Sequence, residues 1–280
     1  MTITDGLVSR SIDVPGARLH YEVRGAGPLL FLVGSPMAAA EFAAIADAMA
    51  TDHTVVTYDP RGYAGSPMDD PDGPSTPDIR ADDVAAIIDA MGGGPVDLFG
   101  SSGGAVTGLA LVTRHPGTVR TLVAHEPPLT ELLPDAAEQR AATEAVIATY
   151  HRDGFQAAWG HFMANAGFDL PDGDGPGAQG APEPTGDQAA ESARFFLHDL
   201  SSTTQYVPDA EAFRSTSTRV VIGLGVDSGG LLTTPTSRAT AEAIGAELAE
   251  FPGDHGGFMG GSHVFADRLR DVLGQPTSTA

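Results

Sequence analysis

The chain has 280 residues, of which 41% are hydrophobic and 19% charged, so it is long and apolar enough to fold as one large domain or two small ones. Its formal net charge of −22 comes from 37 Asp and Glu against 15 basic residues, all of them Arg, and disfavours nucleic acid or anionic membranes as partners while favouring a small neutral or apolar substrate. The absence of cysteine excludes disulfides, thiolate metal sites and a cysteine nucleophile.

The first residues of the chain lack the basic and apolar regions of a secretory signal. No later segment approaches the ~18 consecutive apolar residues of a membrane-spanning helix. We therefore expect a cytoplasmic protein that binds neither membrane nor nucleic acid.

Short apolar runs alternate with amphipathic stretches in the N-terminal half. Residues 8–24 alternate apolar and polar side chains around Pro15 and Gly16, which predicts an antiparallel hairpin. Further buried strands are predicted at Pro28–Val33, Thr54–Tyr58, Val96–Phe99 and Thr121–Ala124. Helices are predicted at Phe42–Ala50, Ile79–Met91 and Ala105–Arg114. This alternation favours an α/β fold, with a mostly parallel central sheet flanked by helices.

The pattern changes in the third quarter of the chain. Residues 135–166 predict one or two helices, residues 169–187 are rich in Pro, Gly and Asp, and residues 188–200 predict another helix. Two further strands are predicted at Arg219–Leu224 and Leu248–Phe251. We interpret the intervening segment as a helical lid inserted between two strands. The predicted division is a lid at 129–217 and a core domain at 1–128 and 218–280.

A strand, a glycine-rich turn and a helix start follow one another at residues 96–105. The turn has the pattern G-x-S-x-G, with Ser102 at its centre. In such a turn the serine is held in a strained conformation above the sheet, and the helix N-terminus offers backbone N–H groups to a developing oxyanion. We therefore predict Ser102 as a nucleophile and the N–H of Gly103 as an oxyanion donor. Ser101 is the competing hydroxyl, but it would leave Phe99 where a small residue is required.

These motifs and the order of the elements resemble the α/β-hydrolase superfamily over nearly the whole chain. Residues 31–36 (Phe-Leu-Val-Gly-Ser-Pro) are similar to the family's H-G-x-P oxyanion loop, with valine in place of the usual histidine. The resemblance implies that the N–H of Ser35 is the second oxyanion donor, since the proline that follows has no N–H. Residues 58–66 resemble the family's D-x-R-G-x-G-x-S turn, which implies that Asp59 and Arg61 are a fold-stabilising pair.

The base and acid that would accompany the serine lie far from it in sequence. His255, in a glycine-rich loop after the last predicted strand, matches the place where this family carries its base, and an imidazole suits proton transfer near neutral pH. His263 is its rival in that region. For the acid, Asp227 lies one position before the family's usual place, whereas Glu126 ends the strand after the nucleophile helix, a place that several hydrolases use. We favour Glu126 and keep Asp227 as the alternative.

Two local matches indicate a narrower group. Gly100-Ser101-Ser102-Gly103 and His125-Glu126-Pro127-Pro128 look like segments of the zearalenone lactonases, in which the glutamate is the triad acid. The oxyanion loop departs from that group. The resemblance implies a serine hydrolase that cleaves an ester bond in a bulky apolar lactone such as zearalenone, through an acyl-enzyme and with no metal or organic cofactor.

The predicted lid carries apolar side chains suited to an aromatic or macrocyclic acyl group, although such residues at helical spacing are also typical of an ordinary core. These candidate substrate-binding residues are Trp159, Phe162, Met163, Phe195, Phe196 and Tyr206. Two other functions stay open. One is a general carboxylesterase acting on small esters, and the other is a non-hydrolytic member of the fold that binds a small ligand.

Overall fold

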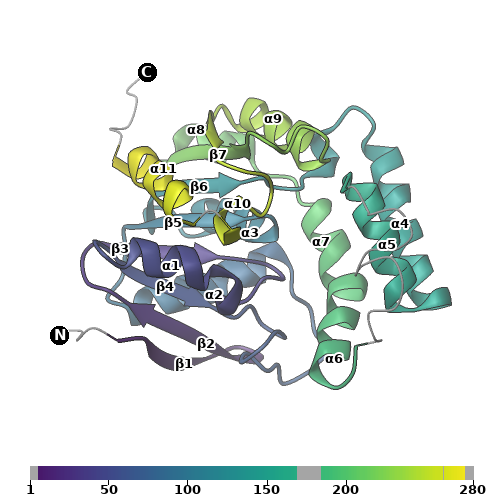
Figure 1. Cartoon of the computed structure of the whole chain (residues 1–280), viewed down its shortest axis with the longest axis horizontal. Coiled ribbons are helices and arrows are strands. Elements are labelled where there is room, and N and C mark those ends of the chain that lie inside the picture. Colours follow the sequence, from purple (N-terminus) through teal and green to yellow (C-terminus); the bar gives the residue numbers. More distant parts are fainter. Residues whose placement is uncertain (1–5, 169–183, 261, 275–280) are drawn as a thin grey trace.

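The computed structural model describes residues 6–168, 184–260 and 262–274, and its centre is an eight-stranded sheet (Figure 1). In order across the sheet, the strands are β1 (Val8–Val14), β2 (Ala17–Arg24), β4 (Thr54–Tyr58), β3 (Leu29–Val33), β5 (Val96–Ser101), β6 (Val119–His125), β7 (Arg219–Gly225) and β8 (Glu247–Phe251). β2 pairs antiparallel with both β1 and β4, and the remaining neighbours pair in parallel. The predicted α/β fold with a mostly parallel sheet is therefore confirmed.

Helices cover both faces of this sheet (Figure 1). One face carries α2 (Pro77–Ala90), α3 (Gly103–Arg114), α8 (Ala210–Ser215) and α9 (Thr233–Ile244). The other carries η1 (Ala39–Phe42), α1 (Ala43–Met49), α10 (Gly257–Gly260) and α11 (Ser262–Gly274). Along β3, Phe31 packs into the first layer while Leu30 and Leu32 pack into the second. Because both faces are buried, the central strands are continuous apolar runs.

The sequence pattern does not predict α9. This helix is rich in Thr and Ser and contains Pro235, features typical of loops. Pro235 lies in the first turn, where a missing N–H is tolerated. Two of its buried hydroxyls are hydrogen-bonded, because Thr236 donates to the carbonyl of Pro127 at 2.8 Å and Thr240 donates to that of Thr236 at 2.7 Å. The buried hydroxyl of Ser237 has no partner among the described residues. A polar helix can therefore pack against the sheet.

Between β6 and β7 the chain forms mainly helices. They are η2 (Thr130–Leu132), α4 (Ala136–Asp153), α5 (Phe155–Ala166), α6 (Asp187–Arg194), the π-helical turn η3 (Phe195–Asp199), α7 (Leu200–Thr204) and α8. Helices α4 to α7 stand together beside the sheet, on the right in Figure 1, whereas α8 packs against α3 and α9. Much of the predicted Pro-, Gly- and Asp-rich tract lies outside the described residues. The division into a core and a lid at 129–217 stays a prediction.

Buried polar contacts join the α6–α7 segment to the sheet domain. The hydroxyl of Tyr63 donates to Oδ2 of Asp199 at 2.7 Å, and Arg80 donates to the hydroxyl of Thr203 at 2.8 Å. Guanidinium nitrogens of Arg80 and Arg194 lie 3.7 Å and 3.9 Å from Oδ1 of Asp199. The charge of this buried carboxylate is therefore compensated inside the protein.

The predicted pairing of Asp59 with Arg61 is wrong. Arg61 instead forms a bidentate ion pair with Asp83 of α2, at 2.7 Å and 2.5 Å. Asp59 accepts hydrogen bonds from the backbone N–H groups of Ala39 and Gly65, both at 2.9 Å. Arg61 and Asp59 therefore both stabilise the fold, but through different partners. The guanidinium of Arg61 pairs with Asp83 on α2, and the carboxylate of Asp59 joins the backbone at Ala39 to that at Gly65.

Candidate active site

Ser102 lies in a tight turn between β5 and α3. Its backbone φ of +55° is strained for a residue with a side chain, and its N–H donates to the carbonyl of His125 on β6 at 2.9 Å. A Cβ atom on Gly104 would lie 2.0 Å from the carbonyl oxygen of Val33, and one on Gly100 would lie 2.5 Å from that of Gly104. Close backbone packing therefore requires small residues on both sides of Ser102.

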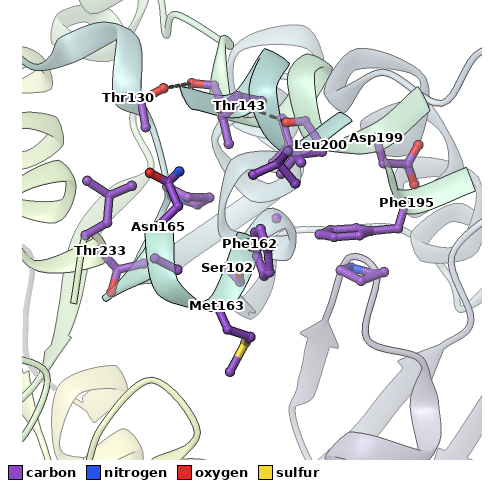
Figure 2. Close-up of a pocket in the computed structure, with 18 of the residues that line it drawn as sticks. Ser102, Thr130, Thr143, Phe162, Met163, Asn165, Phe195, Asp199, Leu200 and Thr233 are labelled. Atoms are coloured by element: carbon purple, nitrogen blue, oxygen red, sulfur yellow. Dashed lines mark hydrogen bonds between the residues drawn. The ribbon is translucent and has the colours of Figure 1, made fainter. Parts of the chain in front are cut away.

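Of the two adjacent serines, Ser102 opens onto a pocket. It is partly exposed and lines a cavity of about 320 Å³, which Figure 2 shows. Ser101 is fully buried, with its hydroxyl 3.3 Å from Nδ1 of His125 inside the core. A substrate in the pocket therefore reaches the hydroxyl of Ser102 and not that of Ser101.

His255 and Glu126 contact each other at the edge of the same pocket. His255 lies in the loop between β8 and α10, lines the pocket, and has its Nδ1 2.7 Å from Oε2 of Glu126. Glu126 follows β6 and is fully buried. It also accepts hydrogen bonds from the N–H of Gly225 at 2.9 Å and from the hydroxyls of Ser228 at 2.5 Å and Thr233 at 2.7 Å. With Nδ1 engaged, the remaining ring nitrogen of His255 is the one available to the pocket.

Glu126 is held as a carboxylate. Burial raises its pKa, but the hydrogen bond from His255, the nearby imidazoles and the hydroxyl of Ser228 lower it, and the resulting pKa is about 2. An ionised carboxylate in this place can fix the tautomer of His255 and stabilise the imidazolium that forms when the ring takes up a proton.

The alternative residues that the sequence offered lie elsewhere. Asp227 is exposed, and its N–H donates to the carbonyl of Gly253 at 3.0 Å. His263 is exposed on α11. The structure therefore brings Glu126, and not Asp227, against His255.

The two predicted oxyanion donors lie side by side next to Ser102. A Cβ atom on Gly103 would lie 2.4 Å from the carbonyl oxygen of Ser35, and both residues line the pocket. Gly103 is the first residue of α3, so its N–H has no partner within the helix. Oxyanion stabilisation by Ser35 and Gly103 stays a prediction that this placement allows.

Four of the six predicted substrate-binding residues line the pocket and form what we call the aromatic wall. They are Trp159, Phe162, Met163 and Phe195. The rings of Trp159 and Phe162 are 5.5 Å apart between centroids, and those of Phe162 and Phe195 are 5.2 Å apart. Figure 2 shows Phe162, Met163 and Phe195 around Ser102. The wall is therefore a continuous apolar surface beside the serine.

The structure places the other two predicted residues, Phe196 and Tyr206, away from the pocket lining. Phe196 is fully buried and stacks on Tyr150 at 5.0 Å, because the neighbouring position on the helix turns it toward α4 and not toward Ser102. Tyr206 follows α7 and packs against the core on the face of the sheet that α2, α3, α8 and α9 cover. These two assignments are corrected.

Several polar residues around the site were not predicted. Ser228 and Thr233 donate to Glu126, and Thr143 and Asn165 line the pocket. The sequence could have indicated one of them. Asn165 lies three residues after Phe162 on the same predicted helix, and therefore on the same helix face. Ser228 and Thr233 have no such signal, because their hydrogen bonds span about a hundred residues of sequence.

His125, directly before Glu126, is fully buried. Its ring is surrounded by four phenylalanine rings at centroid distances of 5.5 to 6.3 Å, those of Phe99, Phe251, Phe258 and Phe265. Burial lowers the pKa of His125 to about 4. The imidazole is therefore neutral near pH 7, and its Nε2 has no hydrogen-bond partner among the described residues.

We expect His125 to make the protein less stable in mild acid. The unfolded histidine takes up a proton near pH 6.5 and the folded one only near pH 4, so stability is full above pH 6.5 and falls by about 3 kcal/mol as the pH drops through this range. His125→Phe fits the aromatic surroundings and should flatten this profile, whereas the exposed control His151→Gln should not. Urea unfolding between about pH 7 and pH 4 measures it, and an unchanged slope in H125F would contradict the expectation.

Neither a membrane-crossing helix nor a metal cluster occurs in the described segments. Each helix there is too short or too polar to traverse a bilayer. No group of three or more His, Asp or Glu side chains in those segments is arranged to hold a metal ion. The residues that define the candidate site are Ser102, His255 and Glu126.

Known proteins are similar to this chain in sequence and in fold. A model of the alpha/beta hydrolase fold family matches residues 27–176. The uncharacterized hydrolase YraK of Bacillus subtilis (strain 168) is 31% identical, over 98% of this chain and 97% of its own. Among solved structures, the enol-lactonase from Burkholderia xenovorans LB400 has a TM-score of 0.61 at 19% identity, over 95% of this chain and 100% of its own. Est816, described as an N-acyl homoserine lactone degrading enzyme, has a TM-score of 0.67 at 18% identity, over 94% and 99%.

Proposed function

This chain belongs to the α/β hydrolase fold family, and on that premise we propose that it is a serine hydrolase that cleaves a carboxylic ester bond, including that of a lactone, through an acyl-enzyme. One observation carries the proposal. Ser102, in its strained turn, and His255, in contact with the buried Glu126, line the same pocket. A nucleophile, a base and an orienting acid are the groups that acyl transfer requires.

In the proposed mechanism, Ser102 attacks the ester carbonyl while His255 takes up the proton of its hydroxyl. The backbone N–H groups of Ser35 and Gly103 stabilise the tetrahedral oxyanion. When the intermediate collapses, the C–O bond breaks, His255 returns the proton to the leaving alcohol, and the acyl group stays on Ser102. His255 then removes a proton from water, which attacks the acyl-enzyme. The bond between the acyl carbon and Oγ of Ser102 breaks, His255 returns the proton to that oxygen, and the acid is released. The sum is ester plus water giving acid plus alcohol.

The aromatic wall supports an apolar acyl group as the proposed substrate. Trp159, Phe162 and Phe195 present ring faces and edges beside the serine, a surface that suits an aromatic or macrocyclic body. A resorcylic macrolactone such as zearalenone is neutral, apolar and carries an ester, so it is the specific candidate that the local sequence matches favour. Lactone cleavage is compatible with this fold, since a protein described as an enol-lactonase has a similar fold.

Water addition to a panel of esters and lactones tests the proposal. We expect the purified protein to open apolar lactones, zearalenone among them, with a mass gain of one water and incorporation of ¹⁸O from labelled water into the acid. The zearalenone product is expected to lose CO₂, because its carboxyl group sits beside phenolic hydroxyls. Short p-nitrophenyl esters serve as the comparison.

Two outcomes would favour the other candidate functions. Brisk cleavage of short esters, with zearalenone intact and no change in Trp159 fluorescence, would indicate a general carboxylesterase. Ligand-dependent fluorescence changes with no hydrolysis of any ester would indicate a non-hydrolytic ligand-binding protein. Both outcomes use the same protein preparation, so the three functions are separated in one set of measurements.

A further inference from the structure

Besides the aromatic wall, the pocket lining contributed by α4 and α5 includes two polar side chains outside the proposed triad, Thr143 and Asn165. These helices run antiparallel, and the hydroxyl of Thr149 lies 3.1 Å from Nδ1 of His161, which sets their register. In this register Thr143 on α4 lies across from Asn165 on α5. Both line the pocket, and Figure 2 shows them on the side away from Phe195.

These two side chains have hydrogen-bonding capacity that the described part of the chain does not use. Thr143 is only 5% exposed, yet its hydroxyl forms no hydrogen bond with another described residue, and the same holds for the partly buried amide of Asn165. Thr130, drawn near them in Figure 2, donates to the carbonyl of Thr204 at 3.1 Å and keeps capacity as an acceptor. Because both side chains line the pocket and have no protein partner for these groups among the described residues, a ligand in the pocket can form hydrogen bonds with them in place of water.

The charges around the pocket restrict the ligand to a neutral group. Outside the triad, Asp199 is the charged residue of the described lining, and it is compensated by Arg80 and Arg194 and accepts a hydrogen bond from Tyr63. The other lining residues are apolar, hydroxyl-bearing or amide-bearing. A charged ligand group at the wall would lose its hydration without gaining a counterion, whereas a neutral one meets hydroxyl and amide partners.

We infer that Thr143 and Asn165 form a subsite for a neutral hydrogen-bonding group of the substrate, namely a hydroxyl, phenol or carbonyl remote from the scissile ester. A hydroxyl and a carboxamide each donate and accept, so the pair suits a carbonyl, which only accepts, as well as a hydroxyl or phenol, which does both. Together with the aromatic wall, the subsite defines the substrate class as an ester or lactone with an apolar ring body and a neutral polar substituent. The inference rests on the proposed function, which supplies the scissile bond at Ser102.

Binding to a protein that cannot turn over tests the subsite apart from catalysis. In a Ser102→Ala background, the fluorescence of Trp159, the chain's one tryptophan, reports ligands that enter the pocket. The probes are methyl esters of ω-phenylalkanoic acids of increasing chain length, each with a para-hydroxyl or a para-methyl group. At the best chain length we expect the hydroxyl member to bind about two- to tenfold more tightly, and Thr143→Val or Asn165→Leu to abolish that preference.

Gln139→Leu is the control, because it removes a carboxamide on α4 outside the pocket lining, where the amide contacts Asp135, and it should keep the preference. Equal affinity of both members at every chain length, or a preference that persists in both Thr143→Val and Asn165→Leu, would overturn the subsite. Assay of the same esters with Ser102 intact separates the two proposals. A hydroxyl preference without hydrolysis would support the subsite and overturn the proposed function, and hydrolysis without the preference would do the reverse.

Discussion

Replacing Ser102 by alanine is expected to lower kcat on the best ester by on the order of 10⁴ to 10⁶. The hydroxyl of Ser102 is the nucleophile of the proposed reaction, and its buried neighbour Ser101 cannot take its place, since that hydroxyl faces His125 in the core. Residual activity would come from binding and oxyanion stabilisation alone. Steady-state kinetics of Ser102→Ala against the wild type measure the loss.

Covalent labelling provides an independent check on the same residue. An organophosphonate should form an adduct at Ser102 and stop turnover, and peptide mapping should find no label on Ser101. The control Ser101→Ala should remain susceptible to the label, because Ser102 keeps its access to the pocket. A label on Ser101, or a Ser102→Ala protein with wild-type kcat, would remove Ser102 from the mechanism.

Glu126→Gln is expected to lower kcat by on the order of 10³ to 10⁴. The amide keeps the shape of the side chain but removes the charge that stabilises an imidazolium at His255. It also places a donor among groups that all donate to Glu126, including Ser228 and Thr233. The variant should therefore favour the wrong tautomer of His255. Measurement of kcat together with urea unfolding separates the catalytic loss from lost stability.

Asp227→Asn is the matched control for Glu126→Gln. It makes the same chemical change at the alternative acid, whose side chain is exposed, so we expect kcat to stay close to that of the wild type. In folded proteins of matched stability, a larger loss from Asp227→Asn than from Glu126→Gln would assign the acid to Asp227.

Most of the fold could be predicted from local patterns. The alternation over residues 8–24 appears as the β1–β2 hairpin, and the apolar runs appear as β3 to β8. Helices that the patterns missed include α8, α10 and α9, and in α9 a Thr-rich sequence with Pro235 is typical of a loop. One buried hydroxyl of α9, that of Thr236, donates to the carbonyl of Pro127, more than a hundred residues away. A prediction from local sequence cannot include such contacts, because the partner residue lies far away in the chain.

The sequence by itself determined the features that neighbouring residues encode. The turn around Ser102 requires small residues within two positions of it, and the loop of His255 is recognised from its own glycines, so both are visible in short windows of sequence. Only the tertiary structure decided which carboxylate meets His255, because that contact joins residues 129 positions apart. It also decided that Phe195 lines the pocket and Phe196 does not, since neighbouring side chains on the η3 turn point in different directions and the packing of α4 selects which one is buried.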